Sequence, residues 1–148
     1  MLRISVVNRQ HSVKINVARM KRHARRILRA TGLVNAELSL AFVDDADMRL
    51  LNATYRKLNE PTDVLAFAMT EGRFSEVNPQ LLGDVVISAE TAAFRARREG
   101  RPTSDELNTL LVHGILHLLG YDHERSAADA RVMRAKERAM RRLIELPA

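Results

Sequence analysis

The chain has 148 residues, of which 46% are hydrophobic, and this length suits one domain with a sizeable buried core. Cysteine is absent, which excludes disulfides and thiolate ligands, so any metal must be held by nitrogen and oxygen atoms. The net charge of +6 favours RNA or DNA as a partner, whereas an aromatic content of 4% is too low for the rows of stacking side chains that single-strand binders use.

The sequence shows no secretory signal and no stretch that could span a membrane, and charge interrupts the first nine residues. We therefore expect a cytoplasmic protein without membrane contact, folded as one domain over residues 1–148. Arginines gather over residues 19–29 and 95–101, and they predict contact with phosphate groups.

The first half of the chain is predicted to alternate between strands and helices. Residues 3–8 alternate polar and apolar side chains at period two, which predicts a strand, and residues 37–43 do the same. Residues 13–31 carry apolar side chains at helical spacing and are followed by Gly32, a usual residue just past a helix end. A second helix is predicted over residues 45–56.

The second half opens with two short apolar runs, 64–69 and 85–88, which predict two further strands. Residues 71–80 contain glycine, asparagine and proline and predict a long loop between these strands. A third helix is expected over residues 88–99, because Gly100 follows it.

Two more helices complete the prediction. Thr103 and Glu106 have the spacing of a capping box and predict the start of a helix that reaches the histidine-rich stretch. Ser126 and Asp129 predict a similar start for a last helix that runs to about residue 146. Elements mixed in this order predict an α+β fold, a small four-stranded sheet packed with about five helices.

Three of the five histidines stand within residues 113–123, which read HGILHLLGYDH. His113 and His117 are four residues apart, so on a helix their ring nitrogens can converge on one ion. Gly120 can adopt the left-handed conformation that ends a helix, and the following turn can bring back His123 as a third ligand. The spacing therefore predicts a metal site made of three histidines.

The helix around this pair is predicted to be buried. From residue 110 to residue 119, every residue except His113 and His117 is apolar or glycine. A buried imidazole without a partner costs about 1–3 kcal/mol, so these two rings require hydrogen bonds or a metal. Either histidine alone could be a core residue bonded to a backbone carbonyl, which is the alternative interpretation.

Three neutral nitrogens leave one coordination position open, which is typical of catalytic rather than structural zinc. One Zn²⁺ ion suits these donors, although nickel, copper and iron do as well. Metzincin proteases share the spacing of the three histidines, but Gly114 stands where they carry the glutamate that acts as general base. A glycine inside a helix indicates either close approach of a substrate or close packing of the helix.

Four segments together resemble the YbeY family of bacterial endoribonucleases: residues 51–56, 61–67, 82–87 and 113–123, in the same order. The resemblance implies a zinc-dependent RNase specific for single-stranded RNA. It further implies a role in rRNA processing, notably maturation of the 3′ end of 16S rRNA, and in ribosome quality control. A cytoplasmic α+β fold is also implied, with the metal at the end of a positively charged cleft.

The resemblance assigns roles to four residues by position. His113, His117 and His123 match the metal ligands of the family, and Arg56 matches its cleft arginine. Taken by itself, Arg56 would be a solvated charge at a helix end. Given the resemblance, we expect Arg56 to contact a phosphate of the RNA during catalysis.

Four carboxylates near the expected site have two interpretations each. Asp63 and Asp84 each stand at a strand start, where a carboxylate usually caps a turn; the alternative is a hydrogen bond that orients a ligand histidine. Asp122 and Glu124 flank His123, and either could act as a general base, although adjacent side chains point apart.

Three other residues are expected to have structural roles only. Tyr121 is expected to pack against the protein, with its hydroxyl group hydrogen-bonded. His11 and His23 are expected at the surface.

Three functions compete at this point. The first is a metal-dependent endoribonuclease with an open three-histidine site. The second is a ribosome-associated RNA-binding factor whose metal is structural, which requires a fourth protein ligand such as Asp63, Asp84, Asp122 or Glu124. The third is a metalloprotease, which requires a carboxylate from elsewhere to replace the base that is absent at Gly114.

Overall fold

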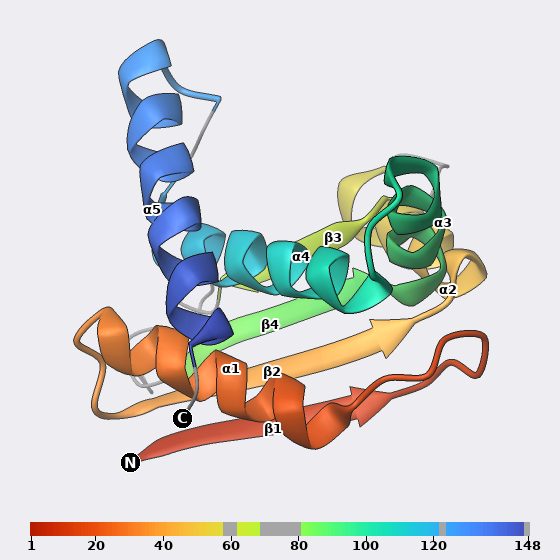
Figure 1. The fold of residues 1–148 in the computed structure, drawn as a ribbon, viewed down its shortest axis with the longest axis horizontal. Coiled ribbons are helices and arrows are strands. Elements are labelled where there is room, and N and C mark those ends of the chain that lie inside the picture. Colours follow the sequence, from red (N-terminus) through yellow and green to blue (C-terminus); the bar gives the residue numbers. More distant parts are fainter. Residues whose placement is uncertain (58–61, 69–80, 122–123, 147–148) are drawn as a thin grey trace.

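The computed structural model describes residues 1–57, 62–68, 81–121 and 124–146. A four-stranded mixed sheet lies at its centre, in the order β1-β2-β4-β3 (Figure 1). Its strands are β1 (Leu2–Asn8), β2 (Ala36–Val43), β3 (Val64–Ala68) and β4 (Leu81–Ser88). The strands β1, β2 and β4 are parallel, while β3 at the edge runs antiparallel to β4.

Five helices are found in the described part of the chain, which confirms the predicted α+β fold. They are α1 (Val17–Ala30), α2 (Asp45–Arg56), α3 (Ala89–Glu99), α4 (Thr103–Leu118) and α5 (Ala127–Glu145). Figure 1 shows α1 and α4 in front of the strands, and α5 runs across these two helices at one end of the molecule. The helix α2 packs on the opposite face of the sheet through Met48, which is buried in one cluster with Val43, Leu65 and Val86.

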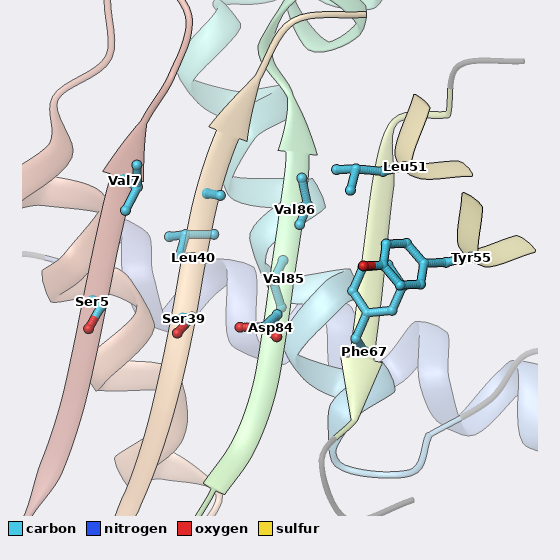
Figure 2. A pocket seen from close by; sticks show the side chains of 11 residues that line it. Ser5, Val7, Ser39, Leu40, Leu51, Tyr55, Phe67, Asp84, Val85 and Val86 are labelled. Atoms are coloured by element: carbon cyan, nitrogen blue, oxygen red, sulfur yellow. The ribbon is translucent and has the colours of Figure 1, made fainter. Parts of the chain in front are cut away.

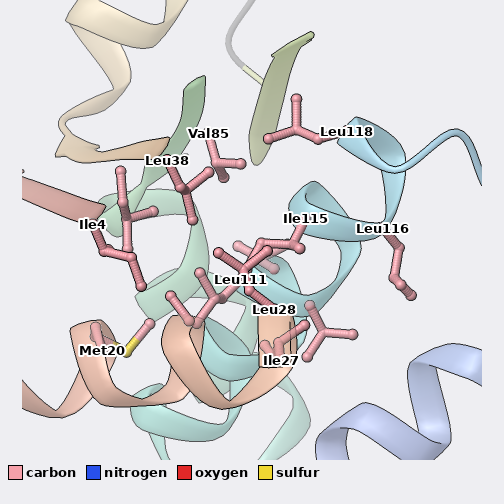
Figure 3. Packing of buried hydrophobic residues seen from close by; sticks show 14 of the residues in the cluster. Ile4, Met20, Ile27, Leu28, Leu38, Val85, Leu111, Ile115, Leu116 and Leu118 are labelled. Carbon is pink, nitrogen blue, oxygen red and sulfur yellow. The ribbon is translucent and has the colours of Figure 1, made fainter. Parts of the chain in front are cut away.

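The main core lies between the sheet and the pair of helices α1 and α4 (Figure 3). Leu111 and Ile115 of α4 are fully buried there, as are Ile27 and Leu28 of α1. Burying a large aliphatic side chain contributes about 1.5–3 kcal/mol. The helix α4, which carries the histidine pair, is therefore one of the most firmly packed elements of the fold.

The first helix begins later than predicted, at Val17 instead of residue 13. The backbone of Val13 bonds at both its N–H and its C=O to the side chain of Gln10, at 2.8 Å each, so it is held in a loop. The side chain of Asn16 accepts a hydrogen bond from the backbone N–H of Arg19 and caps the helix.

The predicted capping box at the start of α4 is wrong. Pro102 holds the cap position, and no side-chain hydrogen bond caps this helix. The carboxylate of Glu106 instead forms ion pairs with Arg95 and Arg101, so its oxygens are engaged there and not at the backbone N–H groups of a capping box. The predicted cap of α5 is confirmed, because Ser126 Oγ accepts a hydrogen bond from the backbone N–H of Asp129.

Strand β4 begins at Leu81, four residues earlier than predicted, since pairing with β2 and β3 continues through Gly83 and Asp84. The loop predicted over residues 71–80 lies outside the described residues. None of the helices in the described part of the chain combines the length and the apolar character that crossing a bilayer requires.

Candidate active site

His113 and His117 lie one turn apart on α4 and line a cavity of about 690 Å³, which we call the histidine cavity. Their ring centroids are 4.7 Å apart and the ring planes meet at 67°. Both side chains are half-buried rather than fully buried, unlike the apolar residues around them. The prediction that the pair shares one face of a helix is confirmed.

A hydrogen bond to the last helix orients the ring of His113. Glu137 of α5 places Oε2 3.2 Å from His113 Nδ1, with the two side chains 16% and 26% exposed. When Nδ1 carries the proton and donates it to this carboxylate, Nε2 is left as the metal-binding nitrogen. A carboxylate that orients a ligand histidine in this way is a usual feature of metal sites.

Glu137 was not identified from the sequence, although a signal for it exists. Met133, Met140 and Ile144 are the buried residues of α5. Glu137 falls between them at helical spacing, so it belongs to the same face of the helix. A carboxylate on an otherwise apolar face requires a buried partner, and the histidine-rich helix provides one.

The absence of a side chain at Gly114 is explained by packing. A Cβ atom there would lie 2.6 Å from Val85 Cγ1, closer than real Cβ contacts, and 3.2 Å from Val64 Cγ2, tighter than most of them. Glycine therefore lets α4 approach β4 and β3, which supports the packing interpretation. A glutamate in this position, as in the metzincins, would have no room for even its first carbon.

Arg56 is the last residue of α2, and it also lines the histidine cavity. The helix ends there because Lys57 adopts the left-handed conformation, with φ of 58°, and its backbone N–H bonds to the carbonyl of Asn52. The structure thus brings Arg56 to the same cavity as His113 and His117. Its side chain is exposed and can reach a ligand from solvent.

Asp63 acts as a turn cap and ion-pair partner. Its Oδ1 accepts the backbone N–H of Val64 at 2.8 Å, and its Oδ2 accepts a hydrogen bond from Arg95 at 2.8 Å. Arg95 also bonds to Glu106, which is almost fully buried. The hydrogen bond that Arg95 donates to Asp63 is the main cause that raises the pKa of Arg95 above its ordinary value. This network fixes the wall of the histidine cavity where β3 begins.

Asp84 does not orient a ligand histidine. Its neighbour Val85 contacts Gly114 of α4, and successive side chains of a strand point to opposite faces. Asp84 therefore lies on the face of the sheet away from α4, where it lines a second cavity. The interpretation of Asp84 as a residue that supports the metal site is wrong for this reason.

The third predicted ligand, His123, lies outside the described residues, as does Asp122. Glu124 lines the histidine cavity. Among the residues that the structure describes, no three histidine, aspartate or glutamate side chains come together closely enough to hold a metal ion. The three-histidine site therefore stays a prediction, of which the first two members lie together.

The prediction for His23 is wrong, because this residue is only 6% exposed. Its Nδ1 lies 3.0 Å from Oδ1 of Asn108, which joins α1 to α4. Burial is the main cause that lowers the pKa of His23 below its ordinary value of 6.5. His11 is exposed as predicted, and Tyr121 packs against the main core as predicted.

The family model of endoribonuclease YbeY matches residues 5–145, nearly the whole chain. The chain belongs to the endoribonuclease YbeY family. The resemblance carried by its four motifs is thereby confirmed. The match includes Glu137 as well as the histidine pair and Arg56, so the cavity that the pair and Arg56 line belongs to the part of the chain that the family shares.

Similar proteins cover most of the chain. The endoribonuclease YbeY of Geobacter metallireducens is 45% identical over 145 residues, which is 97% of each chain. That of Syntrophotalea carbinolica is 49% identical over 135 residues, 90% of each chain. The solution structure of TM1509 from Thermotoga maritima has the same fold, with a TM-score of 0.66 at 22% identity, and the match covers 97% of this chain and 89% of that one.

Proposed function

We propose that this protein is a metal-dependent endoribonuclease that hydrolyses internal phosphodiester bonds of single-stranded RNA. Its relatives are named endoribonucleases, and its net charge of +6 suits a polyanionic substrate. The single observation that carries the proposal is the histidine pair, which opens on a cavity that Arg56 also lines. We place its action in the cytoplasm and in rRNA processing, notably at the 3′ end of 16S rRNA, and in ribosome quality control.

The donor set fits a transition metal. Zinc binds histidine nitrogen at about 2.0–2.1 Å, so two nitrogens on one ion lie at most about 4.2 Å apart. Rings with centroids 4.7 Å apart are compatible with that limit. His113, His117 and His123 would hold the ion, and Glu137 would keep Nε2 of His113 directed away from its own carboxylate. When bound, the metal would supply Lewis acidity toward a phosphate oxygen and an attacking water.

Arg56 is the residue that we expect to meet the phosphate. A guanidinium group is always charged, and its fork of N–H donors matches two phosphoryl oxygens. Negative charge builds up on these oxygens in the transition state, so a preformed donor stabilises the transition state more than the substrate. The left-handed turn at Lys57 holds Arg56 at the end of α2, beside the cavity.

The two alternative functions have less support. A structural metal needs a fourth protein ligand. Asp63 is engaged by Arg95 and Val64, and Asp84 lies on the other face of the sheet, so Glu124 is the candidate that lines the histidine cavity. A metalloprotease needs a base near the metal; Gly114 has no room for one, so the base would have to come from elsewhere in the histidine cavity, such as Glu124.

Cleavage of single-stranded RNA by the metal-loaded protein tests the proposal. We expect cuts within the chain that stop when a chelator removes the metal, and that are lost in the His117→Ala variant because a ligand is missing. Casein and RNA duplexes serve as parallel substrates. Undiminished RNA cleavage by His117→Ala would contradict a metal-dependent mechanism. Cleavage of casein would support the metalloprotease alternative.

A further inference from the structure

A second cavity, of about 380 Å³, lies on the face of the sheet away from α4 (Figure 2). The strand register places Ser5 opposite Ser39, Ser39 opposite Asp84, and Asp84 opposite Phe67. Residues paired across strands share one face, so these four side chains form one row across the sheet. We call this pocket the serine-aspartate cavity.

The walls of the serine-aspartate cavity are apolar and aromatic. Leu51 and Tyr55 of α2 stand over one side, and Val7 and Val86 line the floor beside the polar row. The ring of Tyr55 meets that of Phe67 edge to face at 5.3 Å, and Tyr55 is 65% exposed. An exposed ring fixed by a second aromatic offers a rigid surface on which a planar group can stack.

The two cavities are neighbours around the edge of the sheet. Tyr55 and Phe67 line both of them, and β3, which carries Phe67, is the edge strand. An RNA strand with one phosphate near Arg56 and the histidines can therefore turn past Tyr55 and place an adjoining nucleotide in the serine-aspartate cavity. The volume lies at the lower end of the roughly 300–1,000 Å³ typical of small-ligand sites.

We propose that the serine-aspartate cavity is a subsite for a guanine base of the RNA substrate, next to the phosphate that is cut. This inference rests on the proposed function. A carboxylate accepts hydrogen bonds and repels phosphate, so the base enters the cavity and the backbone stays outside. Unstacked bases of single-stranded RNA are commonly recognised in this way, by an aromatic face and hydrogen bonds to the base edge.

Asp84 selects guanine among the four bases. The Watson–Crick edge of guanine carries two adjacent donors, N1–H and the N2 amino group, which match the two oxygens of one carboxylate. Adenine and cytosine place a ring nitrogen acceptor beside their amino group, and uracil flanks its N–H with two carbonyls. Each of these acceptors faces the carboxylate unfavourably. The hydroxyls of Ser5 and Ser39 can donate or accept and adapt to the remaining polar atoms.

Binding of the four 5′-mononucleotides, measured by isothermal titration calorimetry, tests the subsite without any cleavage. We expect GMP to bind roughly 5- to 150-fold more tightly than AMP, CMP or UMP, the discrimination of one bidentate contact. Asp84→Asn should abolish this preference and favour AMP, because an amide offers one acceptor and one donor. Tyr55→Ala should weaken the binding of all four nucleotides, whereas Tyr55→Phe should bind them as tightly as the wild type.

Glu37→Gln is the matched control, since Glu37 lies on the same face of β2 and outside the cavity. It removes the same charge and should leave GMP binding unchanged. Thermal unfolding of both variants checks that they are folded. Equal binding of all four nucleotides, or a GMP preference that survives Asp84→Asn, would overturn the subsite. Tighter binding of N-acetyl-arginine amide than of GMP would overturn it in favour of a protein partner.

Sequencing of the cut ends from a random RNA separates this inference from the proposed function. Guanine enriched at one position beside the cut, and lost in Asp84→Asn, supports the subsite. Cleavage without any such enrichment overturns the subsite and leaves the endoribonuclease standing. If metal-loaded protein does not cleave at all, the proposed function fails, and the nucleotide titration alone decides whether the cavity takes guanine.

Discussion

The histidine cavity lies against α4, whose neighbouring residues are buried in the main core, whereas the serine-aspartate cavity lies on the sheet face over which α2 packs. In the first, Gly114 brings the helix close to Val85, and Glu137 fixes a ring. In the second, polar side chains take their places from strand register alone.

The difference follows from what each cavity has to bind. A metal requires donors placed within tenths of an ångström, which only packed elements and supporting hydrogen bonds provide. A base tolerates small displacements but requires an accessible stacking surface, which an exposed ring such as Tyr55 provides. Variants that affect one cavity and not the other therefore test this division.

The largest effect is expected from Arg56→Ala. Loss of a donor that acts in the transition state should lower RNA cleavage roughly 100- to 1,000-fold, while metal content stays unchanged because the arginine meets substrate. Arg49→Ala, on the exposed side of the same helix, is the matched control for charge. Metal loss in the Arg56 variant, measured by mass spectrometry of the bound element, would show that the arginine supports the metal instead.

A smaller effect is expected from Glu137→Gln. Loss of the carboxylate that orients His113 should weaken metal binding roughly 10- to 100-fold, as measured by competition with a chelator. GMP binding in the other cavity should be unchanged. Glu145→Gln, exposed on the same helix, controls for the loss of one charge. If the Glu137 variant binds metal as tightly as the wild type, the hydrogen bond has no role in coordination.

Gly114→Ala should destabilise the fold moderately. Overpacking against Val85 costs about 1–3 kcal/mol, and the better helix propensity of alanine returns about 1 kcal/mol. A net loss of up to about 2 kcal/mol in the free energy of unfolding is expected in urea. Ser104→Ala, at the exposed start of α4, should be nearly neutral. A Gly114 variant more stable than the wild type would show that β4 yields without cost.

The smallest effect concerns His23, which lies outside both cavities. The unfolded chain takes up a proton near the ordinary pKa of 6.5, whereas the folded protein does so only at lower pH. His23 therefore costs no stability above about pH 6.5 and destabilises the fold as the pH falls below that value. His23→Gln should reduce the acid loss measured by urea unfolding, and an unchanged pH profile would contradict this.

The sequence predicted what depends on spacing within one element. The pair His113 and His117 share a face because four residues make about one helical turn, and the end of α1 near Gly32 follows from local chemistry in the same way. The four strands were found from their apolar patterns. Arg56 could be assigned to the site only from the family resemblance, because nothing in the pattern of its own helix indicates a functional role.

Contacts between elements could not be predicted in the same way. His23 is buried because α1 and α4 cross where Asn108 lies, and Glu106 lost its predicted capping role to Arg95 and Arg101. The face that Asp84 occupies depends on how far β4 extends, and Gly83 and Asp84 interrupt the apolar run that marked the strand. These features depend on packing and register rather than on the local pattern.

Metal content per chain is the measurement that tests the central claim most directly, namely that His113, His117 and His123 hold one ion. After loading with Zn²⁺ and removal of unbound metal, the protein should contain about one ion per chain. His117→Ala should contain almost none, because loss of a ligand weakens metal binding by more than the roughly 100-fold that loss of a residue supporting a ligand can cause. A His117→Ala protein that keeps its ion at full occupancy would contradict the account.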